Sequence, residues 1–195
     1  MHKQSLEDPE AFWGNIAEQF HWETKWDSVK SSDAIDTSKG AVDIQWFQGG
    51  TTNVCYNAVD RHVKDGKGDK TAMIFEGNEA GRTATLTYAE LQKEVCRTAN
   101  WLKAQGVKKG DAVAIYMPMV LELPIAMLAC ARIGAVHTVV FGGFSADALA
   151  DRIVDSGAKV VMTCSSVMRG AKSIGGRRAK RASPSLWLKK NFSRP

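Results

Sequence analysis

Five consecutive residues have the types and order that suit the binding of a phosphate-bearing ligand. In the run Phe141-Gly142-Gly143-Phe144-Ser145, the two glycines would let a ligand approach the backbone closely. Ser145 can cap the helix expected after it, and the first N–H groups of a helix attract anions. A tight connecting turn with an ordinary cap would have the same sequence. The run therefore indicates either an anion site or a simple turn.

A second candidate group is the basic pair Arg169 and Lys172, three positions apart. A helical turn would bring both charges to one side, where they could meet a phosphate. Solvated surface charge is the more common explanation of such a pair. No catalytic residue is assigned in either group.

The remaining chemically suggestive residues form no recognisable site. The run 64–70, rich in lysine and glycine, lacks the G-x-x-x-x-G-K-[ST] pattern and joins a helix to a strand, so we expect a loop. The histidines and cysteines have no partners at metal-ligand spacing, so no metal site is predicted and the cysteines are expected to be reduced and buried. These residues are three of the four histidines, His21, His62 and His137, and all four cysteines, Cys55, Cys96, Cys130 and Cys164.

The order of elements after residue 110 predicts how the two-glycine run is positioned. Apolar runs of strand length at 112–117, 136–141 and 159–164 alternate with helical patterns at 121–133 and 146–155. Strands without alternating polarity, separated by helices, indicate a parallel sheet covered on both faces. The predicted fold class is therefore α/β. The two-glycine run would then lie at the carboxyl ends of the strands, where such folds bind ligands.

The N-terminal part is expected to be a helical extension. Asp8 and Pro9 can begin one helix, and Asn53 can cap a second one that ends at Gly66. Between them lies an aromatic-rich, irregular segment whose tryptophans are expected to anchor the extension to the body of the protein.

A hairpin and a long helix are expected between this extension and the sheet. Residues 71–75 and 83–87 have strand character and are separated by turn residues. Thr87 and Glu90 form a capping box, and the helix that follows stops at Gly106.

The net charge of +5 is concentrated at the C-terminal end. The stretch 168–195 contains nine Lys or Arg and no acidic residue, so residues 1–167 carry about −4. The run 175–185 has no apolar face at either period and is expected to be poorly ordered. Clustered cations can bind polyanions, but a solvated tail is the simpler expectation, and no specific nucleic-acid binding is predicted. Because neither a signal peptide nor a bilayer-spanning stretch is found, we expect no membrane association and a cytoplasmic location, with an organelle or the nucleus as alternatives.

Several segments together resemble one family, the AMP-forming acetyl-CoA synthetases of the adenylate-forming superfamily. They occur in the family's order and with matching intervals, and the likeness runs from about Leu6 to Ile174. The segments are Phe12-Trp13, His21-Trp22, and the ranges 46–50, 53–63 and 139–145.

This resemblance implies an acetate–CoA ligase, which joins acetate to ATP, releases pyrophosphate and passes the acetyl group of acetyl-AMP to coenzyme A. It also implies that Phe141, Gly142 and Gly143 contact the nucleotide of coenzyme A. Arg169 and Lys172 match two basic positions that meet its adenine and 3′-phosphate end. Lysine keeps the charge of arginine but loses its planar fork, so the contact at Lys172 is expected to be altered.

After Ile174 the sequence departs from the family pattern. The family's phosphate loop, its carboxylates for Mg²⁺ and ribose, its hinge and its C-terminal lysine are not found. We therefore expect a helical extension at 1–66, an incomplete parallel-sheet subdomain of the AMP-binding type at 67–174, and a divergent basic tail at 175–195.

Such a chain is expected to be truncated and inactive alone, with a partial coenzyme A site and no binding of ATP, Mg²⁺ or acetate, which only a full-length form would bind. A truncated gene model, a frameshift or an alternative transcript would explain the departure. An open sheet edge should make the chain marginally stable and prone to aggregate. The alternative function is that of a non-catalytic coenzyme A-binding or regulatory protein that pairs with the full-length enzyme.

Overall fold

The computed structural model describes most of the chain. The described residues are 1–30, 38, 44–78, 81–164, 166–169 and 172–175, the last two ranges by their backbone alone. The chain divides into two compact units, Met1–Asn57 and Ala58–Pro195. The domain boundaries expected after residues 66 and 174 stay predictions. All of the expected basic tail except its first residue lies outside the described residues.

The first unit opens with two helices, α1 (His2–Glu7) and α2 (Pro9–Ala17). The Asp8 carboxylate accepts a hydrogen bond from the backbone N–H of Ala11 at 2.9 Å, and proline occupies the first position of α2. Both features favour helix initiation, and the helix start predicted at Asp8 is confirmed. The apolar pattern does not anticipate α1, because none of its residues is buried.

Aromatic side chains pack together in the rest of the first unit. The ring centroids of Trp22, Trp26 and Phe47 lie 4.9 to 5.4 Å apart. Phe47 belongs to β2 (Trp46–Gln48), which pairs antiparallel with β1 (Ser28–Lys30). The tryptophans thus contact one another within the unit, and their expected role as anchors to the rest of the chain stays a prediction.

The helix expected between Asn53 and Gly66 is present but is wound more widely than an α-helix. Its main parts are two π-helical stretches, η2 (Tyr56–Asp60) and η3 (Val63–Lys67). The side-chain oxygen of Asn53 accepts a hydrogen bond from the N–H of Tyr56 at 3.1 Å, which confirms the predicted cap. Gly66 has a φ of 75° and forms a kink inside η3, so glycine is required there. The sequence pattern thus predicts the extent of this helix but not its winding.

The second unit continues with the predicted hairpin, formed by β3 (Thr71–Glu76) and β4 (Thr83–Thr87), and with α3 (Tyr88–Ala104). The Thr87 hydroxyl accepts from the N–H of Glu90 at 3.2 Å, and the Glu90 carboxylate accepts from the N–H of Thr87 at 2.8 Å. This reciprocal capping box is confirmed. The predicted apolar face of α3 is buried, and it consists of Leu91, Val95, Ala99 and Leu102.

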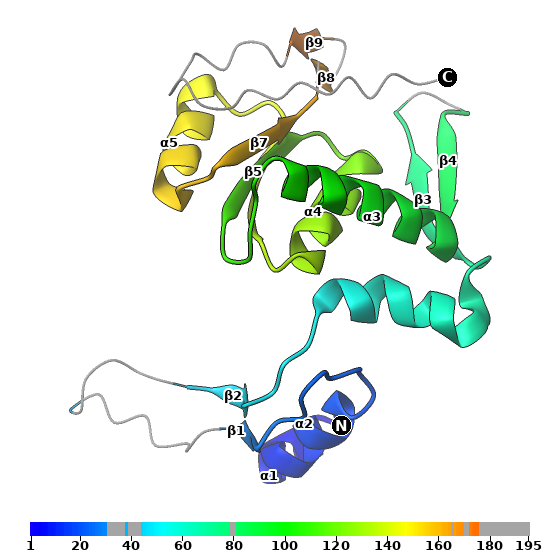
Figure 1. Cartoon of the computed structure of the whole chain (residues 1–195), viewed down its shortest axis with the longest axis vertical. Helices are drawn as coiled ribbons and strands as arrows, with labels where there is room; N and C mark the ends of the chain where they lie inside the picture. The colour runs from blue at the N-terminus through cyan, green and yellow to red at the C-terminus, as the bar shows by residue number, and fades with distance from the viewer. Residues whose placement is uncertain (31–37, 39–43, 79–80, 165, 170–171, 176–195) are drawn as a thin grey trace. The chain divides into compact units, whose positions relative to one another are not determined.

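The parallel sheet contains β5 (Ala112–Met117), β6 (Val136–Phe141) and β7 (Val160–Thr163) in the order β6-β5-β7. The helix α4 (Glu122–Arg132) connects β5 to β6, and α5 (Ala146–Ser156) connects β6 to β7. The two crossovers run in opposite directions along the sheet, and right-handed crossovers therefore place α4 and α5 on opposite faces. Figure 1 shows α5 on one side of the strands and α4, with α3, on the other. The fold is α/β, as predicted.

The central strand β5 carries the most deeply buried part of this unit. Val113, Ala114 and Ile115 have no exposed surface, and their side chains alternate between the two faces of the sheet. Tyr116 packs with Val140 of β6, and this cluster extends onto α5 through Leu149 and Ile153. The core therefore fixes the ends of β5 and β6 relative to the start of α5.

The outer edge of β6 is open among the described residues, because β6 pairs there with β5 alone. Apolar side chains on this strand remain exposed, with exposed fractions of 58% at Val136, 41% at Val139 and 57% at Phe141. The open edge expected from the sequence is that of the sheet's last strand, and both that edge and its effect on stability stay predictions. Separately, each helix in the described ranges is too short or too polar to cross a bilayer.

Candidate functional site

The two-glycine run lies where the sheet topology creates a crevice. The chain leaves the carboxyl end of β5 toward α4 on one face, and it leaves the neighbouring β6 toward α5 on the opposite face. Open α/β sheets bind ligands at such a reversal, outside the carboxyl ends of the strands. The structure thus places Phe141 at the last position of β6 and Gly142 and Gly143 in the turn that follows.

Both glycines are required by the geometry of this turn. A Cβ atom on Gly142 would lie 3.1 Å from the nitrogen of Pro118 and 3.2 Å from the carbonyl carbon of Met117. These are backbone atoms that cannot easily move, so the turn needs glycine to pass this close to the end of β5. Gly143 has a φ of 111°, a conformation that side chains with a Cβ rarely adopt. The turn is therefore more constrained than an ordinary connection.

The hydroxyl of Tyr116 holds this turn from inside the sheet. It accepts a hydrogen bond from the N–H of Gly143 at 3.2 Å and donates one to the carbonyl oxygen of Phe144 at 3.1 Å. The tyrosine is only 8% exposed, so its ring is held by the core while its hydroxyl reaches the surface loop. Tyr116 is not recognisable as a site residue from the sequence, because its position inside an apolar strand gives no local signal of a polar role.

Two exposed aromatic rings flank the glycines. The centroids of Phe141 and Phe144 lie 6.4 Å apart with the rings nearly perpendicular, and the two side chains are 57% and 47% exposed. The guanidinium carbon of Arg152 lies 5.1 Å from the centre of the Phe144 ring, a cation–π arrangement. Exposed rings of this kind can stack on a planar base, and the nearby cation suits an anionic ligand.

Ser145 begins α5 as predicted. Its hydroxyl accepts a hydrogen bond from the N–H of Ala148 at 3.2 Å, which satisfies one of the free donors of the first turn. The last turn ends at Gly157 in the left-handed conformation. α5 is therefore capped at both ends, and its start is fixed relative to the two glycines.

The basic pair lies in a hairpin and not in the helical turn that its spacing would also allow. Arg169 ends β8 (Ser166–Arg169), and Lys172 begins β9 (Lys172–Gly175). The two strands are antiparallel, with Arg169 and Lys172 as register partners across the hairpin. The i, i+3 spacing fits either geometry, and here the backbone is extended. The structure describes only the backbone at these two positions, so the role of their side chains stays a prediction.

The histidines take part in packing and surface contacts. The His21 ring lies 4.3 Å from that of Tyr56, and the His62 ring lies 4.7 Å from that of Tyr88. The Nδ1 atom of His137 is buried without a hydrogen-bond partner among the described atoms. In the part of the chain that the structure describes, no three His, Cys, Asp or Glu side chains come together in a way that could hold a metal ion.

The expectation that all four cysteines are buried is wrong for two of them. Cys55 and Cys130 are buried, whereas Cys96 and Cys164 are half-buried. Burial raises the pKa of Cys130 to about 11, so this thiol is protonated and unreactive at neutral pH. The apolar patterns do not distinguish these two classes, because each cysteine lies within or at the end of a stretch that contains hydrophobic residues.

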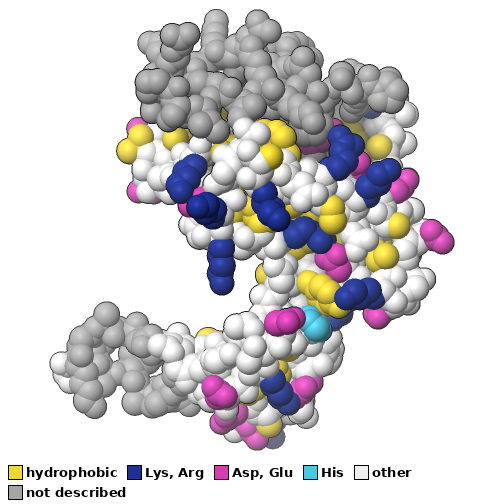
Figure 2. Space-filling model, viewed as in Figure 1, with side chains coloured by type: hydrophobic (Ala, Val, Ile, Leu, Met, Phe, Trp, Pro, Cys, Tyr) yellow, Lys and Arg dark blue, Asp and Glu magenta, His cyan; other side chains and the backbone are white. Residues whose placement is uncertain are grey.

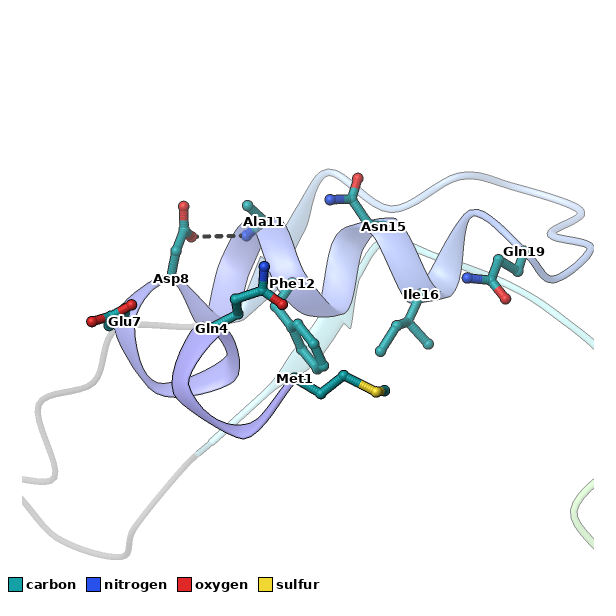
Figure 3. A pocket seen from close by; sticks show the side chains of 9 residues that line it. All are labelled: Met1, Gln4, Glu7, Asp8, Ala11, Phe12, Asn15, Ile16 and Gln19. Atoms are coloured by element: carbon teal, nitrogen blue, oxygen red, sulfur yellow. Dashed lines mark hydrogen bonds between the residues drawn. The ribbon is translucent and has the colours of Figure 1, made fainter.

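Hollows also lie outside this turn. In the first unit, α1 and α2 line a groove of about 430 Å³ that Met1, Phe12 and Ile16 share with polar side chains (Figure 3). Its lining carries the carboxylates of Glu7 and Asp8 and no Lys, Arg, His, Ser or Cys side chain, and no chemistry is assigned to it. In the second unit, Lys and Arg side chains gather on the face seen in Figure 2. Four basic residues, Lys103, Lys108, Lys109 and Arg132, help to line a hollow of about 540 Å³.

Comparison with known protein families accounts for nearly the whole chain. The family described as AMP-binding enzyme matches residues 59–191, and the family described as acetyl-coenzyme A synthetase N-terminus matches residues 1–58. The two matches meet next to the boundary between the compact units, which lies between Asn57 and Ala58.

Similar proteins bear the name acetyl-coenzyme A synthetase. The chloroplastic/glyoxysomal protein of Arabidopsis thaliana is 60% identical over 174 residues, which cover 89% of this chain and 23% of the relative. The proteins of Drosophila melanogaster and Vibrio cholerae are each 51% identical, over 89% of this chain and 26% of the relative. The chain thus spans about a quarter of the length of these relatives.

Proposed function

Since the chain belongs to the AMP-binding enzyme family, we propose that it supplies part of the coenzyme A site of an acetate–CoA ligase. It corresponds to the N-terminal portion of the acetyl-coenzyme A synthetases that it resembles. The observation that carries the proposal is the two-glycine turn at the carboxyl end of β6. There, Gly142 lies against the end of β5, and Gly143 has a backbone conformation that favours glycine.

The proposed ligand contacts follow from the chemistry of each residue. Backbone atoms at Gly142 and Gly143 would approach the nucleotide of coenzyme A, because no side chain stands in the way. The exposed ring of Phe141 offers an apolar surface for the adenine. We assign Arg169 and Lys172 to the adenine and 3′-phosphate end, where two cations would favour a phosphate over a hydroxyl.

The reaction that we propose for the complete enzyme has two steps. Acetate attacks ATP to give acetyl-AMP and pyrophosphate, and the thiol of coenzyme A then takes the acetyl group and releases AMP. Phosphoryl chemistry of this kind depends on positioned cations around the developing charge. We assign neither step to the described residues. Their proposed part is to bind and orient the nucleotide of the second substrate.

Titration of the purified chain with coenzyme A, compared with dephospho-coenzyme A, tests the proposed site. Calorimetry should show that coenzyme A binds about tenfold more tightly than the analogue, because the analogue lacks the 3′-phosphate that would make the charged contact. The double variant Arg169→Ala and Lys172→Ala should remove the preference while the variant keeps the melting temperature of the parent. Equal affinity for both ligands would contradict the assignment of the basic pair.

The alternative is a regulatory, non-catalytic protein that binds polyanions through its basic C-terminal stretch. The observation that favours it is the nine Lys or Arg among residues 168–195, with no acidic residue. Binding to mixed-sequence DNA that weakens steeply with salt, without any preference for the 3′-phosphate of coenzyme A, would support the alternative over our proposal.

Catalysis by the 195 residues alone provides a further test. We propose that they form no acetyl-adenylate, so acetate-dependent release of pyrophosphate from ATP should not exceed the background without protein. Release above that background would refute this part of the proposal. A cytoplasmic location also remains a proposal, which imaging of the tagged protein in cells would test.

A further inference from the structure

We propose that Tyr116 is a positioning residue, whose hydroxyl holds the two-glycine turn in the shape that receives the nucleotide. This inference rests on the proposed function, because it takes coenzyme A as the ligand. The way in which Tyr116 would act follows from the geometry of the second unit alone. Tyr116 has no contact of its own with the proposed ligand, so it would act through Gly143 and Phe144.

The core of the second unit fixes the Tyr116 ring in place. It lies on β5, the central strand, and packs against Val140 and Leu149, which are 1% and 2% exposed. A side chain held on several sides in a close-packed core has little freedom to change rotamer. The position of its hydroxyl is therefore set by the core and not by the loop.

The hydroxyl of Tyr116 contacts two consecutive residues of the turn. The Gly143 N–H donates to it at 3.2 Å, and it donates to the Phe144 carbonyl at 3.1 Å. A hydroxyl that accepts from one residue and donates to the next restricts the orientation of both peptide groups. Gly143 needs such support, because glycine at a φ of 111° has many other conformations open to it.

This restraint extends to the binding surface. With the carbonyl of Phe144 turned toward Tyr116, the Phe144 side chain lies on the surface near Phe141, with Arg152 over its ring. If the hydroxyl were removed, Gly143 and Phe144 would lose this common partner and the turn could sample other conformations. Binding would then cost additional ordering of the loop, and affinity would fall.

The variant Tyr116→Phe tests this mechanism, because it removes the hydroxyl and keeps the ring. In amide hydrogen exchange followed by NMR, the Gly143 amide should exchange at least about three times faster than in the parent, as expected for one lost hydrogen bond. The amide of Ile115, inside β5, should keep its protection. The dissociation constant for coenzyme A should rise by about three- to tenfold.

Tyr88→Phe is the matched control, since it removes a tyrosine hydroxyl from the start of α3 in the same unit. This control should alter neither the exchange of Gly143 nor the affinity for coenzyme A. A comparison of melting temperatures separates loop positioning from general destabilisation. Tyr116→Phe should weaken binding even at temperatures well below its unfolding transition, where the fold is intact.

The outcomes distinguish this inference from the proposed function. If the parent chain does not bind coenzyme A, the proposed function fails, and the exchange of Gly143 still decides whether Tyr116 holds the turn. If the parent binds but Tyr116→Phe leaves the Gly143 exchange unchanged, the positioning role is overturned. Faster Gly143 exchange with unchanged affinity also overturns it, because the held turn would then be irrelevant to the ligand.

Discussion

The carboxylate of Asp60 accepts a hydrogen bond from the Arg132 guanidinium at 2.6 Å, across a separation of 72 residues in sequence. Asp60 also accepts from the side-chain amide of Gln92 at 2.7 Å and is only 8% exposed. These contacts tie η2 to both α3 and α4. A buried carboxylate is tolerated only when it is paired and hydrogen-bonded, so this cluster makes the packing of three helical elements interdependent.

The substitution Asp60→Asn should therefore destabilise the second unit by about 2–4 kcal/mol, because it leaves the Arg132 charge partly buried without its carboxylate. Urea denaturation followed by circular dichroism measures this free energy of unfolding. Glu94→Gln is the control, because its ion pair with Arg97 is exposed and should contribute at most about 1 kcal/mol. Equal losses of unfolding free energy in the two variants would show that burial does not make the ion pair of Asp60 more important for stability than an exposed pair.

A second prediction concerns pH. A hydrogen bond from the Lys159 ammonium, and then one from the N–H of Lys108, lower the pKa of Asp111 below its ordinary value. A carboxylate whose pKa is lower in the folded chain than in the unfolded chain stabilises the fold at pH values above its unfolded-state pKa. This contribution to the free energy of unfolding is lost as the pH falls through the folded-state pKa.

The melting temperature of Asp111→Asn should therefore be lower than that of the parent at pH 7, and the difference should shrink below about pH 3. Lys159→Met removes the main hydrogen-bond donor to Asp111, and the difference in melting temperature between this variant and the parent should also shrink as the pH falls. A difference that stays constant from pH 7 to pH 2.5 would contradict the assignment.

A third prediction concerns thiol reactivity. Because the pKa of Cys130 is raised to about 11 by burial, alkylation of the folded chain by iodoacetamide at pH 8 should be slow at this residue. Half-buried Cys96 should react about tenfold faster, as measured by peptide mass spectrometry. In urea both should react at similar rates. Fast labelling of Cys130 in the folded chain would show that α4 opens readily.

A fourth prediction concerns the close approach at Gly142. Gly142→Ala places a methyl group against backbone atoms of Met117 and Pro118 and should destabilise the fold by about 1–3 kcal/mol. It should also weaken coenzyme A binding. Gly68→Ala is the matched control, because its Cβ would make ordinary contacts with two side-chain methyl groups, Ala89 Cβ at 3.6 Å and Val63 Cγ1 at 3.8 Å. Its effect should stay within about 0.5 kcal/mol. Thermal melts and calorimetry compare the two, and a neutral Gly142→Ala would refute the steric argument.

A fifth prediction concerns the open edge of β6. Val136→Lys puts a charge on an exposed edge position and should reduce aggregation, measured by light scattering at 37 °C, without lowering the melting temperature. Val154→Lys, on the exposed surface of α5, adds the same charge away from the strand and should help less. If both variants reduce aggregation equally, net charge and not the edge is responsible.

The parallel sheet was predictable because its strands are unbroken apolar runs with clear ends. The predicted bounds of β5 and β6 match the structure, since Pro118 and Gly142 stop them. By contrast, β1 and β2 have three residues each, which is too short for a periodic pattern to be detected. The order of the strands also could not be obtained from hydrophobicity alone, because it depends on contacts between distant segments.

The candidate site was predictable only in part, for a similar reason. Gly142 and Gly143 are recognisable in the sequence because glycine pairs between a strand and a helix are local signals. The role of Tyr116 depends on a contact that crosses 27 residues, and Asp60 meets Arg132 only after α3 and α4 have packed. The spacing of Arg169 and Lys172 suited a helix, but the pairing of β8 with β9 determines the local conformation.

The strand order β6-β5-β7 also constrains how this protein is made. Val113 of β5 pairs with His137 on one side and with Val160 on the other. The central strand can therefore complete its hydrogen bonds only after both later strands have been synthesised. During synthesis, β5 remains open along one edge until β7 has left the ribosome. Pairing across such intervals is slow, and the waiting strand is strongly apolar. We therefore expect chaperones to engage the nascent chain between the emergence of β5 and that of β7.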